Sequence, residues 1–196
     1  MTPERIQRLT HVLKHRQFNL TIVLENVLDP HNISAVMRTA DAVGVQEIYV
    51  LNTRIAPHKK FGAKSSSSAA KWLTVHQYTN VQECFDVLTA KGFAIYTTQL
   101  TERSVSLYAL DLTQQVALVF GNEHSGVSQE VSMLAHGNFM IPQVGIIKSL
   151  NISVACAVSL YEAQRQKKIA GHYDATTLNP QQQALMQQWA VVQDDD

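Results

Sequence analysis

The chain has 196 residues, 45% of them hydrophobic, and its 16 Lys and Arg residues balance 16 Asp and Glu residues. That length suits a single domain with small appendages, and the apolar content is sufficient for a packed core. The sequence has neither an apolar signal core at its start nor an uncharged apolar run of roughly 18 residues, so we expect a soluble, cytoplasmic protein with no membrane partner.

The hydrophobic pattern predicts helices that alternate with short strands. In the first third of the chain we expect a helix over 3–16, a strand at 20–25, a helix over 32–43 that stops at Gly44, a strand at 47–51 and a polar loop at 52–68. Strands at 73–78 and 93–97 should follow on either side of a helix that ends at 91–92. The rest of the chain should form a buried strand at 116–120, a helix over 128–135, a strand at 139–141, a helix of small residues after 149, and a helical tail. This alternation predicts an α/β fold with a mostly parallel sheet and helices on both faces.

Basic residues are unevenly distributed. Glu4 is the only acid before residue 25, no acid lies between Ile48 and Gln82, and the acidic surplus sits at 194–196, a tail that we expect to be mobile. Basic clusters that meet in a fold are typical of a protein that binds a phosphate backbone, although each alone suits a solvated surface. The candidate RNA contacts are Arg5, Arg8, Lys14, Arg16, Lys59, Lys60, Lys64, Arg165, Lys167 and Lys168.

The helix predicted after 29–31 carries the first candidate site. Helical spacing places its apolar residues on one face and Arg38 on the opposite side, near Asp41. By pattern alone, Arg38 is an exposed residue paired with Asp41, and Asn32 is an ordinary N-cap.

The segment 121–128 follows the buried strand. Gly121 and Gly126 have the spacing of a phosphate-binding P-loop, but Val127 stands where that motif requires Lys, so a nucleoside-triphosphate site is excluded. No GxGxxG motif occurs either. Glu123 is therefore a hydrogen-bond acceptor in a site or merely a turn residue. His11 and His15 are four residues apart without a third ligand, and we predict no metal.

The third segment, 140–161, places polar groups where a buried helix should begin. Ser149 and Asn151 precede a run of small and β-branched residues. They can cap a core helix, or they can bind an anion with the free N–H groups at its start.

Taken together and in order, the three segments resemble the motifs of the SpoU/TrmH branch of the SPOUT RNA methyltransferases. The motifs are Pro-His-Asn-Ile-Ser-Ala-Val-Met-Arg-Thr-Ala, Leu-Val-Phe-Gly-Asn-Glu-His-Ser-Gly-Val-Ser and Ile-Pro-Gln-Val-Gly-Ile-Ile-Lys-Ser-Leu-Asn-Ile-Ser-Val-Ala. The resemblance implies S-adenosylmethionine as methyl donor, a ribose 2′-hydroxyl as acceptor, a homodimer built around the carboxyl-terminal helices, and a trefoil knot in the carboxyl-terminal half.

The resemblance also assigns roles. It places Arg38, Asn32, Glu123, Ser149 and Asn151 at the catalytic centre, with Ser149 on a substrate phosphate. It places the donor against backbone groups near Thr98, Gly121, Ile141 and Leu150. A guanidinium with a pKa above about 12 is a poor base, so we interpret Arg38 as a clamp on phosphate and ribose and leave the proton acceptor open.

The basic amino-terminal helix and the passage 160–173 narrow the substrate. They are similar to those of the subgroup that methylates the guanosine at position 18 in the D-loop of tRNA, whereas the Gln-rich, acid-tipped region 179–196 is shorter than in some members. The expected division is a helical tRNA-contact extension at 1–19, the SPOUT domain at 20–165, and a helical extension with an acidic tail at 166–196. The alternatives are a methyltransferase of the same family that acts on rRNA or another tRNA position, and a non-catalytic RNA-binding relative.

Overall fold

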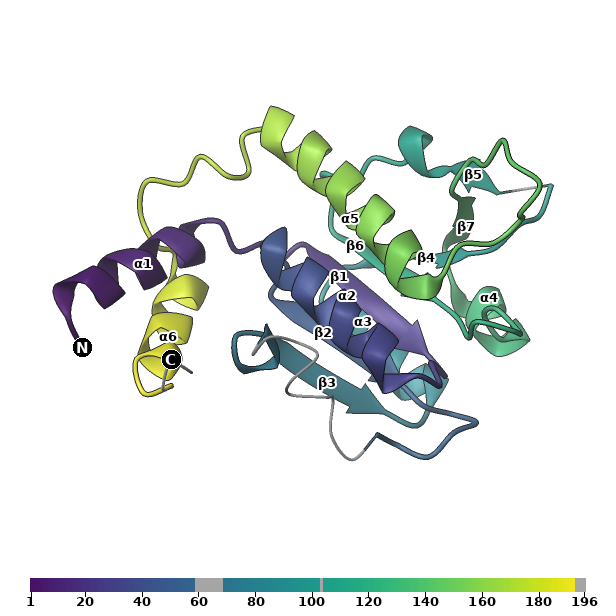
Figure 1. Cartoon of the computed structure of the whole chain (residues 1–196), viewed down its shortest axis with the longest axis horizontal. Coiled ribbons are helices and arrows are strands. Elements are labelled where there is room, and N and C mark those ends of the chain that lie inside the picture. Colours follow the sequence, from purple (N-terminus) through teal and green to yellow (C-terminus); the bar gives the residue numbers. More distant parts are fainter. Residues whose placement is uncertain (59–68, 103, 193–196) are drawn as a thin grey trace.

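The computed structural model describes residues 1–58, 69–102 and 104–192 (Figure 1). Within these ranges the strands are β1 (Leu20–Glu25), β2 (Glu47–Leu51), β3 (Thr74–Tyr78), β4 (Ala94–Thr98), β5 (Val105–Ser106), β6 (Val116–Phe120) and β7 (Gly137–Met140). The helices are α1 (Pro3–Lys14), α2 (Pro30–Ala42), α3 (Val81–Ala90), α4 (Gln129–Leu134), α5 (Ile152–Ile169) and α6 (Pro180–Trp189), with short 3-10 turns η1 (Ala69–Lys71) and η2 (Leu107–Ala109).

The described strands form one sheet in the order β3-β2-β1-β6-β4-β7-β5. Every neighbouring pair is parallel, so the predicted parallel sheet is confirmed. The central strand β6 is buried along its whole length, as its all-apolar sequence predicts. Parallel pairing brings the carboxyl ends of β1, β6 and β4 to one edge, where open α/β sheets place their ligands.

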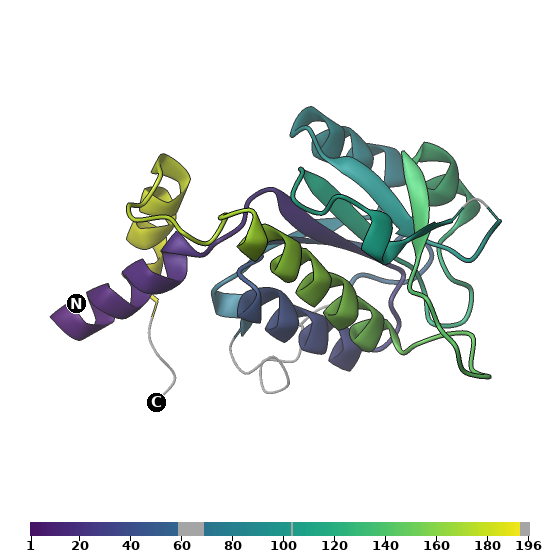
Figure 2. The same ribbon diagram turned by 90° about the horizontal axis from the view of Figure 1, so that it is seen from above.

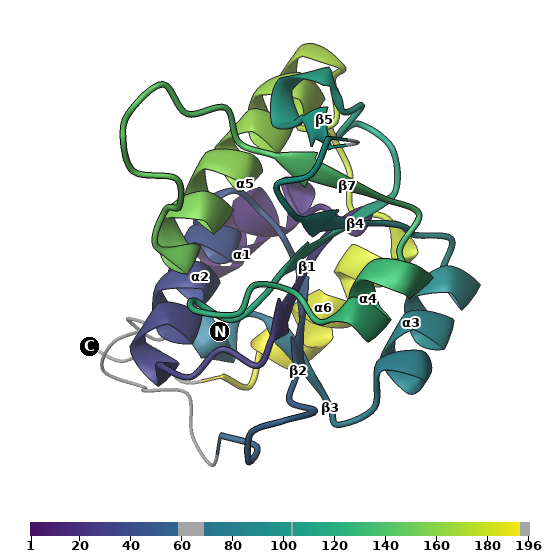
Figure 3. The ribbon, with the colours of Figure 1, turned by 90° about the vertical axis from the view of Figure 1, so that its right-hand side faces the viewer.

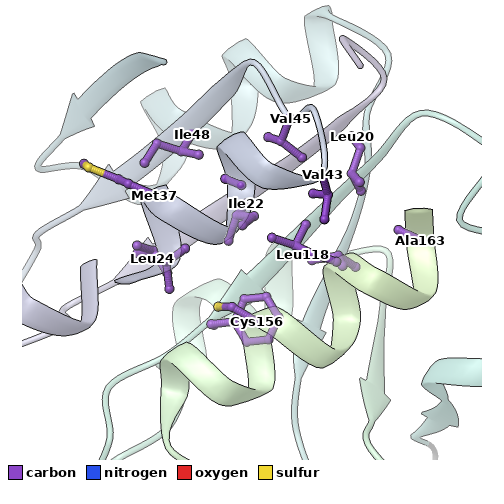
Figure 4. Packing of buried hydrophobic residues seen from close by; sticks show 14 of the residues in the cluster. Leu20, Ile22, Leu24, Met37, Val43, Val45, Ile48, Leu118, Cys156 and Ala163 are labelled. Atoms are coloured by element: carbon purple, nitrogen blue, oxygen red, sulfur yellow. The ribbon is translucent and has the colours of Figure 1, made fainter. Parts of the chain in front are cut away.

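Helices cover both faces of the sheet (Figure 3). On one face, α2 and α5 pack over side chains of β1 and β6, among them Ile22 and Leu118, and α5 contributes Cys156 and Ala163 to this core (Figure 4). On the other face, α3 and α4 pack over a second core that includes Val119. The predicted α/β layering is therefore confirmed.

The two terminal helices pack together beyond the end of the sheet (Figure 2). Leu9 and Leu13 of α1 meet Leu185 and Trp189 of α6, and the Trp189 ring lies edge-on to Trp72 at 5.2 Å between centroids. The helical extensions predicted at both ends therefore exist. The expected boundary at 165 falls inside α5, which continues to Ile169, and the division into domains stays a prediction.

Most element bounds agree with the sequence pattern to within one or two residues, but the cap of α2 and the strand β5 differ from it. Helix α2 begins at Pro30 and its N-cap is Asp29, whose carboxylate accepts from the backbone N–H of His31 at 2.8 Å, so the prediction of Asn32 as N-cap is wrong. The two-residue strand β5 does not follow from the sequence pattern. The acidic tail at 194–196 and most of the loop at 52–68 lie outside the described residues. The trefoil knot stays a prediction.

Candidate functional site

A cavity of about 350 Å³ opens at the carboxyl ends of β4, β6 and β7, beside the first turn of α5. Its walls include the apolar side chains Phe120, Phe139 and Ile152 and several polar groups. All four residues that the resemblance assigns to the donor line this cavity, namely Thr98, Gly121, Ile141 and Leu150. Segments far apart in the sequence thus meet in one site.

Gly121 occupies a point where two backbone segments nearly touch. A Cβ atom built on Gly121 would lie 2.2 Å from the carbonyl carbon of Gly126 and 2.2 Å from the nitrogen of Val127. These are backbone atoms, which cannot rotate away as a side chain can. The tight turn from 121 to 126 therefore requires glycine at its first position.

The turn itself is fastened by Asn122. Backbone bonds of 3.0 and 2.9 Å join Asn122 and Gly126 in both directions. The Asn122 side chain accepts from the N–H groups of His124 and Ser125 at 2.9 and 3.2 Å, and it donates to the carbonyl of Asn26 at 2.8 Å. Sequence reasoning missed Asn122, because its role depends on the distant residue Asn26.

Three predicted catalytic residues form a hydrogen-bonded chain at the cavity rim. Asn32 of α2 donates from Nδ2 to a carboxylate oxygen of Glu123 at 2.9 Å, and its Oδ1 accepts from Nδ2 of Asn151 at 3.2 Å. Asn151, the N-cap of α5, accepts in turn from the N–H and hydroxyl groups of Ser153 at 2.8 and 2.6 Å. Each amide is thereby held in one orientation.

The remaining two predicted catalytic residues lie differently. Ser149 lines the cavity, although the cap of α5 is Asn151 alone. Arg38 is exposed on α2, about 9 Å along the helix axis from Asn32, and is not among the cavity-lining residues. Asp41 pairs with Arg16 at 2.5 Å, and the expected pairing of Arg38 with Asp41 stays a prediction.

The two thiols have no nucleophilic setting. Burial raises the pKa of the Cys84 thiol to about 12 and that of the Cys156 thiol well above its ordinary value, since a thiolate is poorly solvated in a core. The described residues contain no group of three or more His, Cys, Asp or Glu side chains that could hold a metal ion. Among the same residues, no helix is long and apolar enough to cross a membrane.

The model of the SpoU rRNA Methylase family matches residues 19–161 of the chain. The chain belongs to the SpoU methylase family. A tRNA (guanosine(18)-2′-O)-methyltransferase of Thermus thermophilus is 42% identical to this SpoU methylase over 190 residues, which is 96% of each chain.

Solved structures agree with this membership. The A. aeolicus TrmH/SpoU tRNA modifying enzyme superposes on this SpoU methylase with a TM-score of 0.88 and 35% identity, over 97% of this chain and 98% of that one. An AdoMet-bound rRNA methyltransferase from Sinorhizobium meliloti has a TM-score of 0.69 and 27% identity, over 78% of this chain and 59% of that one.

Two of the predicted RNA contacts of this SpoU methylase are buried. Arg16 is 3% exposed, donates to the carbonyl of Val45 at 3.1 Å and lies over the Trp189 ring, and burial lowers the pKa of its guanidinium. Lys167 is fully buried and donates to Asn19 Oδ1 at 2.8 Å, and desolvation lowers its pKa to about 8. Both predictions are wrong, because spacing along the chain does not show which charges face inward.

The other predicted contacts of this SpoU methylase vary in setting. Arg8 and Lys168 are exposed, Lys14 is half-buried, and Arg5 bonds to backbone carbonyls of Trp189 and Val192. Arg165 is exposed but pairs with Glu162 at 2.8 Å. The predicted contacts Lys59, Lys60 and Lys64 lie outside the described residues.

Proposed function

We propose that this chain transfers a methyl group from S-adenosylmethionine to the ribose 2′-oxygen of the guanosine at position 18 in the D-loop of tRNA. The observation that carries the proposal is the meeting of the four donor positions and the Asn32–Glu123–Asn151 chain at one cavity. The choice of tRNA is supported by the T. thermophilus tRNA methyltransferase, which is similar to this chain along almost its whole length.

The cavity suits the donor in size and chemistry. Its volume of about 350 Å³ falls within the range of roughly 300–1,000 Å³ that is usual for small-molecule sites. Gly121 lines the cavity at the end of β6, and the apolar walls fit an adenine ring. We expect Thr98, Gly121, Ile141 and Leu150 to hold the donor, which supplies an activated methyl group on a sulfonium.

The residues at the rim orient the acceptor. Asn32, Glu123 and Asn151 are fixed by their mutual hydrogen bonds, so they can position a ribose without further ordering, and such positioning supplies much of the rate of a displacement. Ser149 binds a substrate phosphate. The Arg38 guanidinium binds phosphate and ribose and polarises the hydroxyl group that loses its proton.

A homodimer is part of the proposal. Exposed apolar side chains gather on the loop before α5 and on α5 itself, at Val144, Ile146, Ile147, Val154 and Tyr161. Large apolar side chains exposed together on one loop and the helix that follows it are typical of a protein interface. Helix α5 packs beside α2, which carries Arg38, and we propose that a second copy on this face also contacts α2. Arg38 lies outside the cavity of its own chain, and the dimer offers a route for it to reach the cavity of the partner.

Mixed dimers test that arrangement. An inactive Arg38→Ala chain combined with an inactive Gly121→Ala chain should regain up to about half of the activity if each site uses the Arg38 of the partner. No recovery in a verified mixed dimer would contradict it. We also propose, with the family, a trefoil knot in the carboxyl-terminal half and action on tRNA in the cytoplasm.

The activity is tested with purified protein, labelled S-adenosylmethionine and separate pools of total tRNA and rRNA. Label in tRNA alone supports the proposal, and label in rRNA alone favours the rRNA alternative. A folded protein that binds RNA but transfers no methyl group is a non-catalytic relative. The T. thermophilus tRNA methyltransferase matches this chain over 96% of each chain, whereas the longer S. meliloti rRNA methyltransferase matches over 59% of its own chain. This difference favours tRNA as the substrate.

A further inference from the structure

Asn26 connects two loops at the carboxyl edge of the sheet. It directly follows β1, has a positive φ of 51° and is 6% exposed. Its Oδ1 accepts from the backbone N–H groups of Thr53 and Arg54, both at 2.9 Å, and its Nδ2 donates to the Thr53 hydroxyl at 3.0 Å. Its own carbonyl accepts from Asn122 at 2.8 Å. One buried residue thus holds the loop after β2 against the cavity turn.

The sheet order explains why these loops are neighbours. Strand β1 lies between β2 and β6, and all three are parallel, so their following loops leave the same edge side by side. A second bond fastens the same loop, since the His58 imidazole donates from Nε2 to the carbonyl of Val27 at 2.8 Å. The loop after β2 is therefore held at both 53–54 and 58 against the segment that leads into α2.

Arg54 is the cationic residue in the loop that Asn26 holds. Its side chain is exposed, and it belongs to the acid-free stretch between Ile48 and Gln82. In the described part of the chain no carboxylate lies within ion-pairing distance of its guanidinium. A guanidinium binds a phosphate through two parallel hydrogen bonds, and a backbone that is already fixed lowers the entropy lost on binding.

We propose that Arg54 binds a phosphate of the acceptor RNA beside the methyl-transfer cavity, and that Asn26 is the positioning residue that holds it there. The inference rests on the proposed function insofar as the acceptor is an RNA. Arg54 contacts the substrate, whereas Asn26 holds the backbone of Thr53 and Arg54 in place and does not contact the substrate itself. The bond from Asn122 to the Asn26 carbonyl holds the turn that lines the donor cavity at the same edge of the sheet.

Steady-state kinetics of Arg54→Gln test the contact. We expect the KM for a tRNA transcript to rise about tenfold, because a charge-assisted bond is lost. The KM for the donor should stay within twofold. The salt dependence of kcat/KM for RNA should lose about one unit of slope, which a purely structural change would not cause. Lys71→Gln is the matched control, since Lys71 is exposed and adjoins Trp72, which packs on Trp189 far from the cavity.

Asn26→Gly tests the positioning role. Glycine accepts the positive φ and keeps the carbonyl that receives the Asn122 bond. The variant loses the side-chain bonds to Thr53 and Arg54 and a longer bond of 3.4 Å to the Glu25 carboxylate. The RNA KM should rise, and the double variant with Arg54→Gln should be no worse than Arg54→Gln alone. Fully additive effects would show that Asn26 does not act through Arg54.

Two outcomes separate this inference from the proposed function. If the wild type methylates RNA while Arg54→Gln keeps the wild-type RNA KM and salt slope, the Arg54 contact is overturned and the proposed function stands. If the wild type methylates no RNA, the proposed function fails. Fluorescence anisotropy with the same transcript then decides the contact, and equal dissociation constants for wild type and Arg54→Gln would overturn it.

Discussion

The close approach of the backbone at Gly121 gives the sharpest prediction. An alanine Cβ there would lie 2.2 Å from two backbone atoms, whereas ordinary contact begins at 3.4 Å, so the turn must open by about 1.2 Å. The turn cannot open freely, because Asn122 ties it to Asn26 and Glu123 is bonded to Asn32. A displacement of about 1 Å in a site costs about a hundredfold in rate, and overpacking costs roughly 1–3 kcal/mol of stability.

Gly121→Ala should therefore weaken donor binding and reduce kcat/KM by about a hundredfold or more. Isothermal titration with S-adenosylhomocysteine measures the donor site, and thermal melting shows whether the protein still folds. The matched control is Gly145→Ala, because a Cβ at Gly145 would meet nothing within 4 Å. A folded Gly121→Ala protein with donor affinity within twofold of the wild type would refute the reasoning.

Four further variants extend the account. Asn32→Asp places a second carboxylate where the amide donates to Glu123 at 2.9 Å. The rate constant of methyl transfer in single-turnover assays should therefore fall by about a hundredfold. An unchanged rate constant would show that the hydrogen-bonded chain does not position the acceptor. Arg38→Ala should abolish methyl transfer, while calorimetry should still detect binding of the donor. Loss of donor binding would contradict the assignment of Arg38 to the acceptor part of the site. Bonds to His76 and Lys91 lower the pKa of Glu47 to about 2, against an ordinary value of 4.5. The contribution of Glu47 to the free energy of unfolding is therefore present above about pH 4.5 and lost as the pH falls toward 2. Urea unfolding of Glu47→Gln should therefore show about 2 kcal/mol less stability at pH 7 and a much smaller difference near pH 2; a constant difference would contradict this. Burial lowers the pKa of Lys167 from 10.5 to about 8, so the folded state favours the neutral amine form more than the unfolded state does. The free energy of unfolding should therefore rise between about pH 8 and pH 10.5 in the wild type, and Lys167→Met should lack that rise.

The sequence was sufficient for the elements that follow a simple pattern. The alternation of apolar runs and helical faces located β1, β6 and α5, because each buries a continuous surface whose spacing is visible in the sequence. The two-residue strand β5 has no such pattern, since two residues cannot show a period.

The candidate site could be predicted only in part. Residues of the donor cavity were placed by the resemblance to a family, not by periodicity, and the structure brings them together. The sequence alone does not distinguish Asn32 from the true helix cap Asp29, because Asp29 stands only three residues earlier; the Pro that follows Asp29 is the signal that favours it. Asn26 and Asn122 were missed because their value lies in a contact between residues 96 positions apart.

Charge along the chain was the least reliable guide. Lys167 lies on the same inward stripe of α5 as Leu160 and Ala163, and its ammonium group is satisfied by Asn19 and Thr113 at the protein interior. Arg16 is likewise held between Asp41 and Trp189. A basic cluster in the sequence therefore combines surface cations with cations that are buried between elements of the fold.

The most direct test of the account is to map the methylated nucleotide. The purified protein is incubated with S-adenosylmethionine and a tRNA transcript, and nuclease fragments are analysed by mass spectrometry. A matched transcript carries 2′-deoxyguanosine at position 18, which removes only the acceptor hydroxyl. We predict one added methyl group, as 2′-O-methylguanosine at position 18, in the first transcript and none in the second. Methylation at another nucleotide, or equal methylation of both transcripts, would contradict the account.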